Sequence, residues 1–174
     1  MATGRGFNQH VISTSVYHSH VHAGIMFSVD VFDLALAGGG TLGILFVTPA
    51  TPPIHILYDG ELGGDAKLEL FEDVTVSANG TLLAPINRNR NSAFTDGVTA
   101  YQDPTVTDFG LTLDTLVVPG GSGGAAQGGG AAITLDWELK VSSQNLLLLT
   151  NLTGQNHIAH LHTDYYYEFH GTTV

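Results

Sequence analysis

Short apolar and β-branched runs recur throughout this chain, and clusters of glycine, proline or asparagine separate them. This spacing is typical of an all-β sandwich or barrel, because each run is long enough for one strand and each cluster supplies a turn. We therefore expect an all-β, antiparallel β-sandwich of about nine or ten strands and no helix. The expected strands cover residues 23–36, 42–49, 54–62, 66–76, 81–89, 98–102, 110–118, 132–141, 145–153 and 157–169.

Two of these segments alternate between apolar and charged residues, which predicts one packed and one solvated face. Leu68, Leu70 and Val74 share one parity of the segment 66–76, and Leu135, Trp137, Leu139 and Val141 share one parity of the segment 132–141. The intervening "SANGT" at 77–81 contains Asn-Gly, a strong signal for a tight hairpin. The sequence thus predicts a β-hairpin between the strands 66–76 and 81–89.

The length of 174 residues fits a single domain with its own core. We expect a loose N-terminal arm over 1–15, one sandwich domain over 16–174, and a flexible glycine-rich loop over 119–131. Five Lys and Arg against 16 Asp and Glu give a formal net charge of −11, which argues against nucleic acid as a partner. The sequence has no apolar run of membrane-spanning length and no signal-like N-terminus, so we expect no membrane partner and no export.

Nine histidines are many for this length, and two groups of them are candidates for metal binding. His18, His20 and His22 alternate in "YHSHVH", so on a strand their rings would share a face and could bind Zn²⁺ or Ni²⁺. Three ligands from one strand stand too far apart to close a compact site easily. The alternative is a solvated or subunit-facing stripe of histidines.

Gly154, His160 and His162 match the opening of the cupin pattern G-x5-H-x-H-x3,4-E-x6-G. Glu168 and Gly171 then fall outside the required spacing, and too few residues remain for a second cupin motif. The competing interpretation is a last strand whose His160, His162 and Tyr165–Tyr167 line a face or a subunit contact, where amphipathic rings are frequent. A metal-dependent jelly-roll enzyme that uses His160 and His162 therefore stays an alternative.

The sequence contains no G-x-S-x-G elbow, no phosphate-binding loop and no cysteine nucleophile. The acidic pairs Asp30 with Asp33 and Asp136 with Glu138 fit the outward positions of amphipathic strands. We accordingly predict no catalytic residue, no cofactor and no enzymatic activity.

One stretch resembles a known family. "KLELFEDVTVSANGTLLAPINRNRNS", with "GILFVTP" upstream of it, is similar to sequences of tailed-bacteriophage head decoration (cement, or auxiliary capsid) proteins. The resemblance covers about residues 42–93, and the glycine-rich loop and the aromatic C-terminal strand "DYYYEFH" agree in style. The "YHSHVH" segment and the length of the glycine-rich loop are not features of that family.

The resemblance implies a jelly-roll-like β-sandwich that assembles as a homotrimer and binds the major capsid protein on the outer surface of a virion, after synthesis in the host cytoplasm. It implies no catalytic residue. An alternative in the same setting is a virion protein that binds a receptor glycan.

The segment Asn87, Arg88, Asn89, Arg90 and Asn91 concentrates two of the five basic residues. On a strand, the two arginines would share one parity and could donate bidentate hydrogen bonds to carboxylates or carbonyls of the capsid or of another subunit. We expect this segment, with Tyr165, Tyr166 and Tyr167, to form an interface. The alternative is that the arginines pair with carboxylates of their own chain, such as Asp96 or Asp103, and organise a loop.

Overall fold

The computed structural model describes residues 16–120, 129–132 and 136–169, which form one short helix followed by strands. The elements are α1 Val16–Ala23, β1 Met26–Leu36, β2 Thr41–Val47, β3 Ile54–Leu62, β4 Ala66–Glu72, β5 Thr75–Ala78, β6 Thr81–Leu82, β7 Ile86–Asn87, β8 Thr99–Gln102, β9 Thr105–Asp108, β10 Leu111–Val118, β11 Gly129–Ala132, β12 Trp137–Leu139, β13 Gln144–Asn151 and β14 His157–Tyr167.

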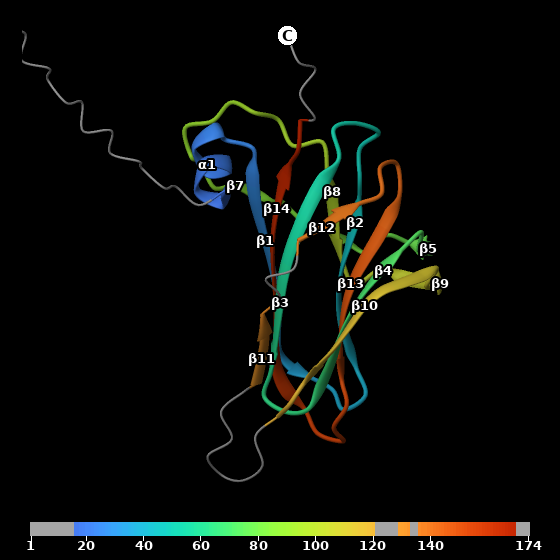
Figure 1. Ribbon diagram of the computed structural model, residues 1–174. Coiled ribbons are helices and arrows are strands. Elements are labelled where there is room, and N and C mark those ends of the chain that lie inside the picture. Colours follow the sequence, from blue (N-terminus) through green and yellow to red (C-terminus); the bar gives the residue numbers. More distant parts are fainter. Residues whose placement is uncertain (1–15, 121–128, 133–135, 170–174) are drawn as a thin grey trace, which may run out of the picture.

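Two antiparallel sheets face each other and form a sandwich (Figure 1). The first sheet has the order β11-β3-β14-β1-β7, with β12 also paired to β3. The second sheet has the order β10-β4-β13-β2-β8-β6, and β5 pairs with β9 in a separate two-stranded ribbon. The expected all-β antiparallel sandwich is confirmed.

The core lies between the two sheets and takes alternate residues from each strand. Val29 and Val31 of β1 and Leu161 of β14 point inward from the first sheet, and Leu68 and Leu70 of β4 do so from the second. This confirms the predicted inward parity of Leu68 and Leu70, but Val74, which was predicted on the same face, lies beyond the end of β4 and is buried in a cluster on the other side of the sheet. Tyr58 of β3 also links the sheets, because its hydroxyl donates a hydrogen bond to Asp114 Oδ2 of β10 at 2.9 Å.

A second, smaller apolar cluster lies on the other side of the second sheet. Leu45, Phe71 and Leu146 are buried there beneath Val76 and Val106 of the β5–β9 ribbon. Strand β13 therefore buries both of its faces, which explains why its sequence "NLLLLTN" is continuously apolar rather than alternating. The ribbon projects from the side of the sandwich in Figure 1.

The predicted hairpin at "SANGT" is wrong. Strand β5 pairs with β9, and β6 pairs with β8, so residues 77–81 connect the ribbon to the second sheet instead of joining two neighbouring strands. Gly80 has a positive φ of 91°, and a side chain there would collide with the carbonyl of Gln102. The glycine is thus needed for close approach of two backbones rather than for a two-residue turn.

The expectation of no helix is also wrong, because residues 16–23 form α1. The helix ends at Ala23, and the next residue, Gly24, has a φ of 74° and donates its N–H to the carbonyl of Val21, while Ile25 N–H donates to the carbonyl of His20. This is the Schellman pattern of a glycine C-cap. Within the described part of the chain, no helix is long and apolar enough to cross a membrane.

Two predicted segments fall wholly or partly outside the described residues. These are the N-terminal arm at 1–15 and the section 121–128 of the glycine-rich loop. The end of the predicted loop is different from expectation, because Gly129–Ala132 forms β11 and pairs with residues 59–62 of β3.

Candidate functional site

The asparagine-rich segment 87–92 begins with Asn87 at the end of the two-residue strand β7, and residues 88–92 form a turn instead of the continuous strand predicted. Asn87 Nδ2 donates to the carbonyl of Gly24 at 2.8 Å, and Asn89 Nδ2 donates to the carbonyl of His22 at 3.2 Å. Ser92 Oγ donates to the same Gly24 carbonyl at 3.1 Å. We call residues 87–92 the asparagine clasp, because their side chains hold the C-terminal end of α1.

The asparagines also organise the turn itself. Asn87 Oδ1 accepts from the N–H of Asn89, and Asn89 Oδ1 accepts from the N–H of Asn91, as in successive Asx-turns. The alternation of Asn with Arg thus has an intramolecular cause. The prediction that both arginines project from one face of a strand is wrong, since only Asn87 of this segment belongs to a strand.

The two arginines have different surroundings. Arg88 Nη1 donates to Asp164 Oδ2 of β14 at 2.6 Å, so this arginine does pair within the chain, although with neither Asp96 nor Asp103. Arg90 is exposed, and no hydrogen bond or ion pair of its side chain is seen among the described residues. A contact of Arg90 with a partner stays a prediction.

The three consecutive tyrosines do not form the predicted surface. Tyr165, Tyr166 and Tyr167 are 0%, 4% and 1% exposed. The hydroxyls of Tyr165 and Tyr167 both donate to the carboxylate of Asp96, and that of Tyr166 donates to Asp136. Burial, together with these carboxylates, raises the pKa of all three phenols. Tyr165 and Tyr167 belong to the core between the sheets, whereas Tyr166 is covered by the rings of His20 and His55 on the outer side.

The outer face of the first sheet instead carries an acid–histidine ladder, formed by Asp30 of β1, Asp59 of β3, and His160, His162 and Asp164 of β14. The strand register places Asp30 and Asp59 on either side of His162. His162 Nδ1 lies 2.6 Å from Asp30 Oδ1, and His160 Nε2 lies 3.3 Å from the same oxygen. Oppositely charged groups thus alternate across three neighbouring strands.

These contacts change the protonation of the ladder. The carboxylate of Asp164, and after it that of Asp30, raises the pKa of His162 to about 9, although burial acts in the opposite direction. Burial disfavours ionisation of Asp164, but hydrogen bonds from His162 and Ser28 and the charge of Arg88 outweigh it and lower the pKa. Burial raises the pKa of Asp59. His162 is therefore a cation at neutral pH.

Three exposed apolar side chains continue the same face beyond the ladder. Phe32 and Leu34 of β1 are 65% and 69% exposed, and Ile158 of β14 is 63% exposed. Because Phe32 pairs with His160 and Asp33 pairs with Ala159, the three side chains lie together at one end of the sheet. We call them the apolar corner. Single exposed apolar residues are ordinary, but a group of them marks a surface suited to contact with another molecule.

The histidine group at the N-terminus is helical, which corrects the expectation that His18, His20 and His22 share a strand face. His18 and His22 are four residues apart on α1, and their Nε2 atoms are 2.8 Å from each other. His20 points elsewhere and stacks on the ring of Tyr166, with a centroid distance of 4.2 Å. The three rings therefore do not converge on one ion.

His160 and His162 lie outside the sandwich, on the solvent side of β14, with 38% and 31% of their side chains exposed. The inward positions between and beside them are the buried Ala159, Leu161 and Thr163. A cupin-type site inside the sandwich would require these histidines at the inward parity. The structure therefore gives His160 and His162 a place in a surface ladder.

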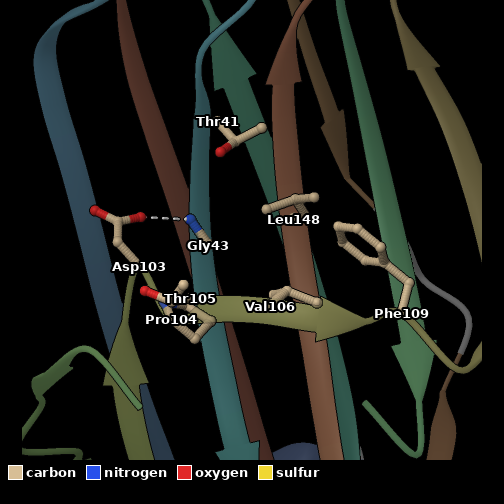
Figure 2. Close-up of a pocket in the computed structure, with 8 residues that line it drawn as sticks. All are labelled: Thr41, Gly43, Asp103, Pro104, Thr105, Val106, Phe109 and Leu148. Carbon is tan, nitrogen blue, oxygen red and sulfur yellow. Dashed lines mark hydrogen bonds between the residues drawn. The ribbon is translucent and has the colours of Figure 1, made fainter. Parts of the chain in front are cut away.

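A pocket of about 380 Å³ lies between the second sheet and the strand β9 (Figure 2). Its lining includes the hydroxyl-bearing Thr41 and Thr105, the carboxylate of Asp103, and the half-exposed ring of Phe109. Asp103 Oδ1 accepts a hydrogen bond from the N–H of Gly43 at 2.9 Å, so this carboxylate also ties the loop to β2. An aromatic ring opposite several hydroxyl and carboxylate oxygens can bind a small polar ligand.

Among the described residues, His55, Glu138 and Glu168 have ligand atoms within 4.8 Å of one another and could hold a metal ion. Sequence reasoning missed His55 and assigned Glu138 only to a solvated strand face. The sequence does show a histidine within the predicted strand 54–62, which could have marked His55 as a candidate ligand. It does not show that β12 and the end of β14 both lie beside that histidine.

No protein-family model and no curated protein matches this sequence.

Proposed function

We propose that this chain is a structural binding module that decorates the outside of a tailed-phage head and stabilises the shell. The family resemblance of residues 42–93 supplies the setting, which implies contact with the major capsid protein and a homotrimer. The observation that carries the proposal is the outer face of the first sheet, where the exposed apolar corner adjoins a charged ladder. Such a face can bury apolar area on a partner while the charges set its orientation.

The strand order supports a jelly roll as the finer description of the sandwich. The long strands β1, β14 and β3, followed by β11 and β12, face β2, β13, β4 and β10. First and last strands are thus neighbours in one sheet, and each sheet is filled alternately from both halves of the chain, as in two interlocked Greek keys. This agrees with the architecture that the family resemblance implies.

The test is attachment to heads of the phage that encodes the chain, prepared without it. Purified protein added to such heads should give density on the outside of the shell in electron cryomicroscopy. The double variant Phe32→Ser with Leu34→Ser should attach at least tenfold more weakly, because it removes the apolar part of the contact. The matched control is Val117→Ser, which changes a side chain that is 70% exposed on the second sheet and should leave attachment unchanged.

The absence of this chain from the outer surface of heads mixed with an excess of it would contradict the proposal. Attachment that is unaffected by the double variant but lost with the control would contradict the assignment of the contact to the first sheet and place it on the second.

The pocket beside Phe109 favours a second function, binding of a receptor glycan by a virion protein. Sugars stack on exposed aromatic rings and bind hydroxyl and carboxylate oxygens, and the pocket presents both. A glycan array would show selective binding that Phe109→Ala abolishes, whereas Phe32→Ser would not affect it. An array without signal would remove this alternative.

A further inference from the structure

His55 is surrounded by three carboxylates that come from distant parts of the sequence. It lies on β3, opposite Glu138 of β12 and Tyr166 of β14 in the strand register. Asp136 immediately precedes β12, and Glu168 immediately follows β14. The Nε2 atom of His55 is 2.6 Å from Glu168 Oε2 and 3.4 Å from Glu138 Oε2, and the Nδ1 atom is 3.1 Å from Asp136 Oδ1. We call these four residues the His55 group.

The two ring nitrogens have different partners. Nδ1 forms a hydrogen bond with Asp136, whose other carboxylate oxygen accepts from the hydroxyl of Tyr166. A carboxylate that binds one nitrogen of an imidazole fixes the tautomer and leaves the lone pair of the other nitrogen for a ligand. This is the usual support of a metal-binding histidine.

The second nitrogen has the position expected of a ligand. Nε2 is buried and makes no hydrogen bond among the described residues, even though two carboxylate oxygens lie near it. Ligand atoms on a tetrahedral zinc ion stand about 3.3 Å apart when the bonds are about 2.0–2.1 Å. The distance to Glu138 fits that spacing, and Glu168, whose side chain is 43% exposed, has room to retreat.

Charge also favours a cation at this point. Three carboxylates meet one imidazole, whereas the basic residues Lys67, Arg88 and Lys140 pair elsewhere with Glu69, Asp164 and Asp73. With a protonated histidine the three carboxylates leave two negative charges, whereas with a neutral imidazole and a divalent ion they leave only one. A nitrogen with carboxylate oxygens suits zinc or a neighbouring divalent transition metal.

The ring of His55 is held in place by stacking. Tyr166 lies parallel to it, with centroids 5.0 Å apart and an angle of 12°, and His20 of α1 stacks on Tyr166 at 13°. The His55 group is thereby connected to the N-terminal helix as well as to three strands. An ion bound there would tie β3, β12 and the end of β14 together.

We propose that His55, Glu138 and Glu168 bind one divalent transition-metal ion of the zinc class, with Asp136 as the positioning residue of His55. The site is independent of the proposed attachment to a capsid. Its ligands are neither the helical histidines nor the ladder on β14.

The experiment uses the full chain without a histidine tag, freed of metal with a chelator and then titrated with Zn²⁺ against a chromophoric competitor. One ion per chain should bind, and the same ion should raise the unfolding temperature. Glu138→Gln and Glu168→Gln should each raise the Kd at least tenfold, because each removes a charged ligand with little change of shape. Asp136→Asn should weaken binding about 10–100-fold, as loss of an orienting carboxylate does.

The control is the double variant His18→Ala with His22→Ala, which removes the exposed pair on α1 and should keep the tight ion. Co²⁺ supplies a second readout, since an ion in a four-coordinate nitrogen–oxygen site absorbs visible light strongly, and Glu168→Gln should abolish that band. None of these measurements requires a capsid, so their failure would leave the decoration proposal standing.

Two outcomes would overturn the metal site. One is an unchanged Kd for Zn²⁺ when Glu138→Gln and Glu168→Gln are combined. The other is a protein whose unfolding temperature does not respond to Zn²⁺ but falls in Glu168→Gln, which would identify the His55 group as a salt-bridge network around a protonated histidine.

Discussion

Gly24 shows how a single residue fixes the junction between α1 and β1. Its φ of 74° is unfavourable for other residues, and a side chain there would collide with Ser92 of the asparagine clasp. Gly39 has nearly the same φ, 73°, but nothing lies within 4 Å of its missing side chain. We predict that Gly39→Ala costs about 1 kcal/mol of unfolding free energy from backbone strain, and that Gly24→Ala costs about 1–3 kcal/mol more from the collision.

Urea unfolding of the two variants measures this difference directly. Equal losses for Gly24→Ala and Gly39→Ala would mean that Ser92 moves aside at no cost and that the clasp is looser than the contacts indicate.

His162 makes stability depend on pH. Its pKa is about 9 in the folded chain and 6.5 in a free histidine, so the folded state retains a proton that the unfolded state has lost between these values. The contribution of His162 to the free energy of unfolding should therefore be present in full below pH 6.5 and be lost as the pH rises toward 9. The facing groups are Asp30, Asp59, His160 and Asp164, with Arg88 bound to the last of them.

We expect a loss of about 1 kcal/mol across this window, since half-exposed ion pairs are screened by solvent. Unfolding by urea at pH 6.5 and 9 should show it, and His162→Gln should flatten the dependence. His157→Gln, on the same strand, serves as the control. A wild-type slope that survives His162→Gln would assign the titration to another group.

At the scale of elements, the asparagine clasp explains how a short helix without a buried residue is kept in place. The side chain of Asn89 donates a hydrogen bond to the carbonyl of His22 and accepts one from the backbone N–H of Asn91. We predict that Asn89→Ala costs about 1–2 kcal/mol, since each hydrogen bond contributes about 0.5–1.5 kcal/mol, and that it speeds amide hydrogen exchange in α1. Asn91→Ala, whose backbone N–H keeps its acceptor, should have little effect on either quantity. Unaltered exchange in α1 after Asn89→Ala would show that the contacts of the His20 and Tyr17 rings with Tyr166 are enough to hold the helix.

The elements that the sequence predicted correctly are those with a simple pattern. Strands β1, β3 and β14 alternate in polarity because one of their faces meets the core, and their bounds lie close to the predicted ones. The single strand predicted at 66–76 is divided into β4 and β5, which belong to different sheets. The helix was missed because alternating histidines mimic a strand, and β9 was missed inside a segment rich in turn residues. The hairpin failed because Asn-Gly reports a tight local bend and cannot show which strands pair beyond it.

The candidate sites were harder to predict for a related reason. The histidines of β14 were recognised, but their partner Asp30 comes from a strand 130 residues away. The tyrosines were assigned to a face or subunit contact because amphipathic rings are frequent there. In the structure, Asp96 and Asp136 accept hydrogen bonds from their hydroxyls and allow all three to be buried. Long-range pairing of this kind follows from the strand order, which a single sequence does not reveal.

At the scale of the whole molecule, the two faces of the sandwich differ. The β5–β9 ribbon covers part of the second sheet, while the first sheet presents the ladder and the apolar corner. Along β1, strand β7 pairs only with Phe27 and Ser28, and an irregularity between Asp33 and Leu36 interrupts the strand further on. Such irregularities and outward-facing aspartates discourage pairing of sheet edges. Contacts through the face are therefore favoured over the addition of strands at this edge.

The last prediction separates the two arginines of the clasp in the proposed homotrimer of 18.3 kDa chains. Arg88 pairs with Asp164 in its own chain, so Arg88→Ala should lower the unfolding free energy by about 0–1 kcal/mol and change assembly little. Arg90 is exposed, so Arg90→Ala should leave the unfolding free energy of the chain unchanged. It should weaken trimer formation or attachment to heads more than tenfold, because loss of one member of a buried interfacial charge pair costs about 2–5 kcal/mol.

Light scattering and head-binding assays measure the assembly of both variants, and urea unfolding measures their stability. Arg90→Lys should restore little, since an ammonium group cannot reproduce the planar, bidentate contact of a guanidinium. Normal assembly of Arg90→Ala would show that Arg90 makes no essential contact with a partner and would contradict the prediction. In that case the orientation of the chain on its partner would depend on the acid–histidine ladder, and His162→Gln would become the variant that weakens attachment.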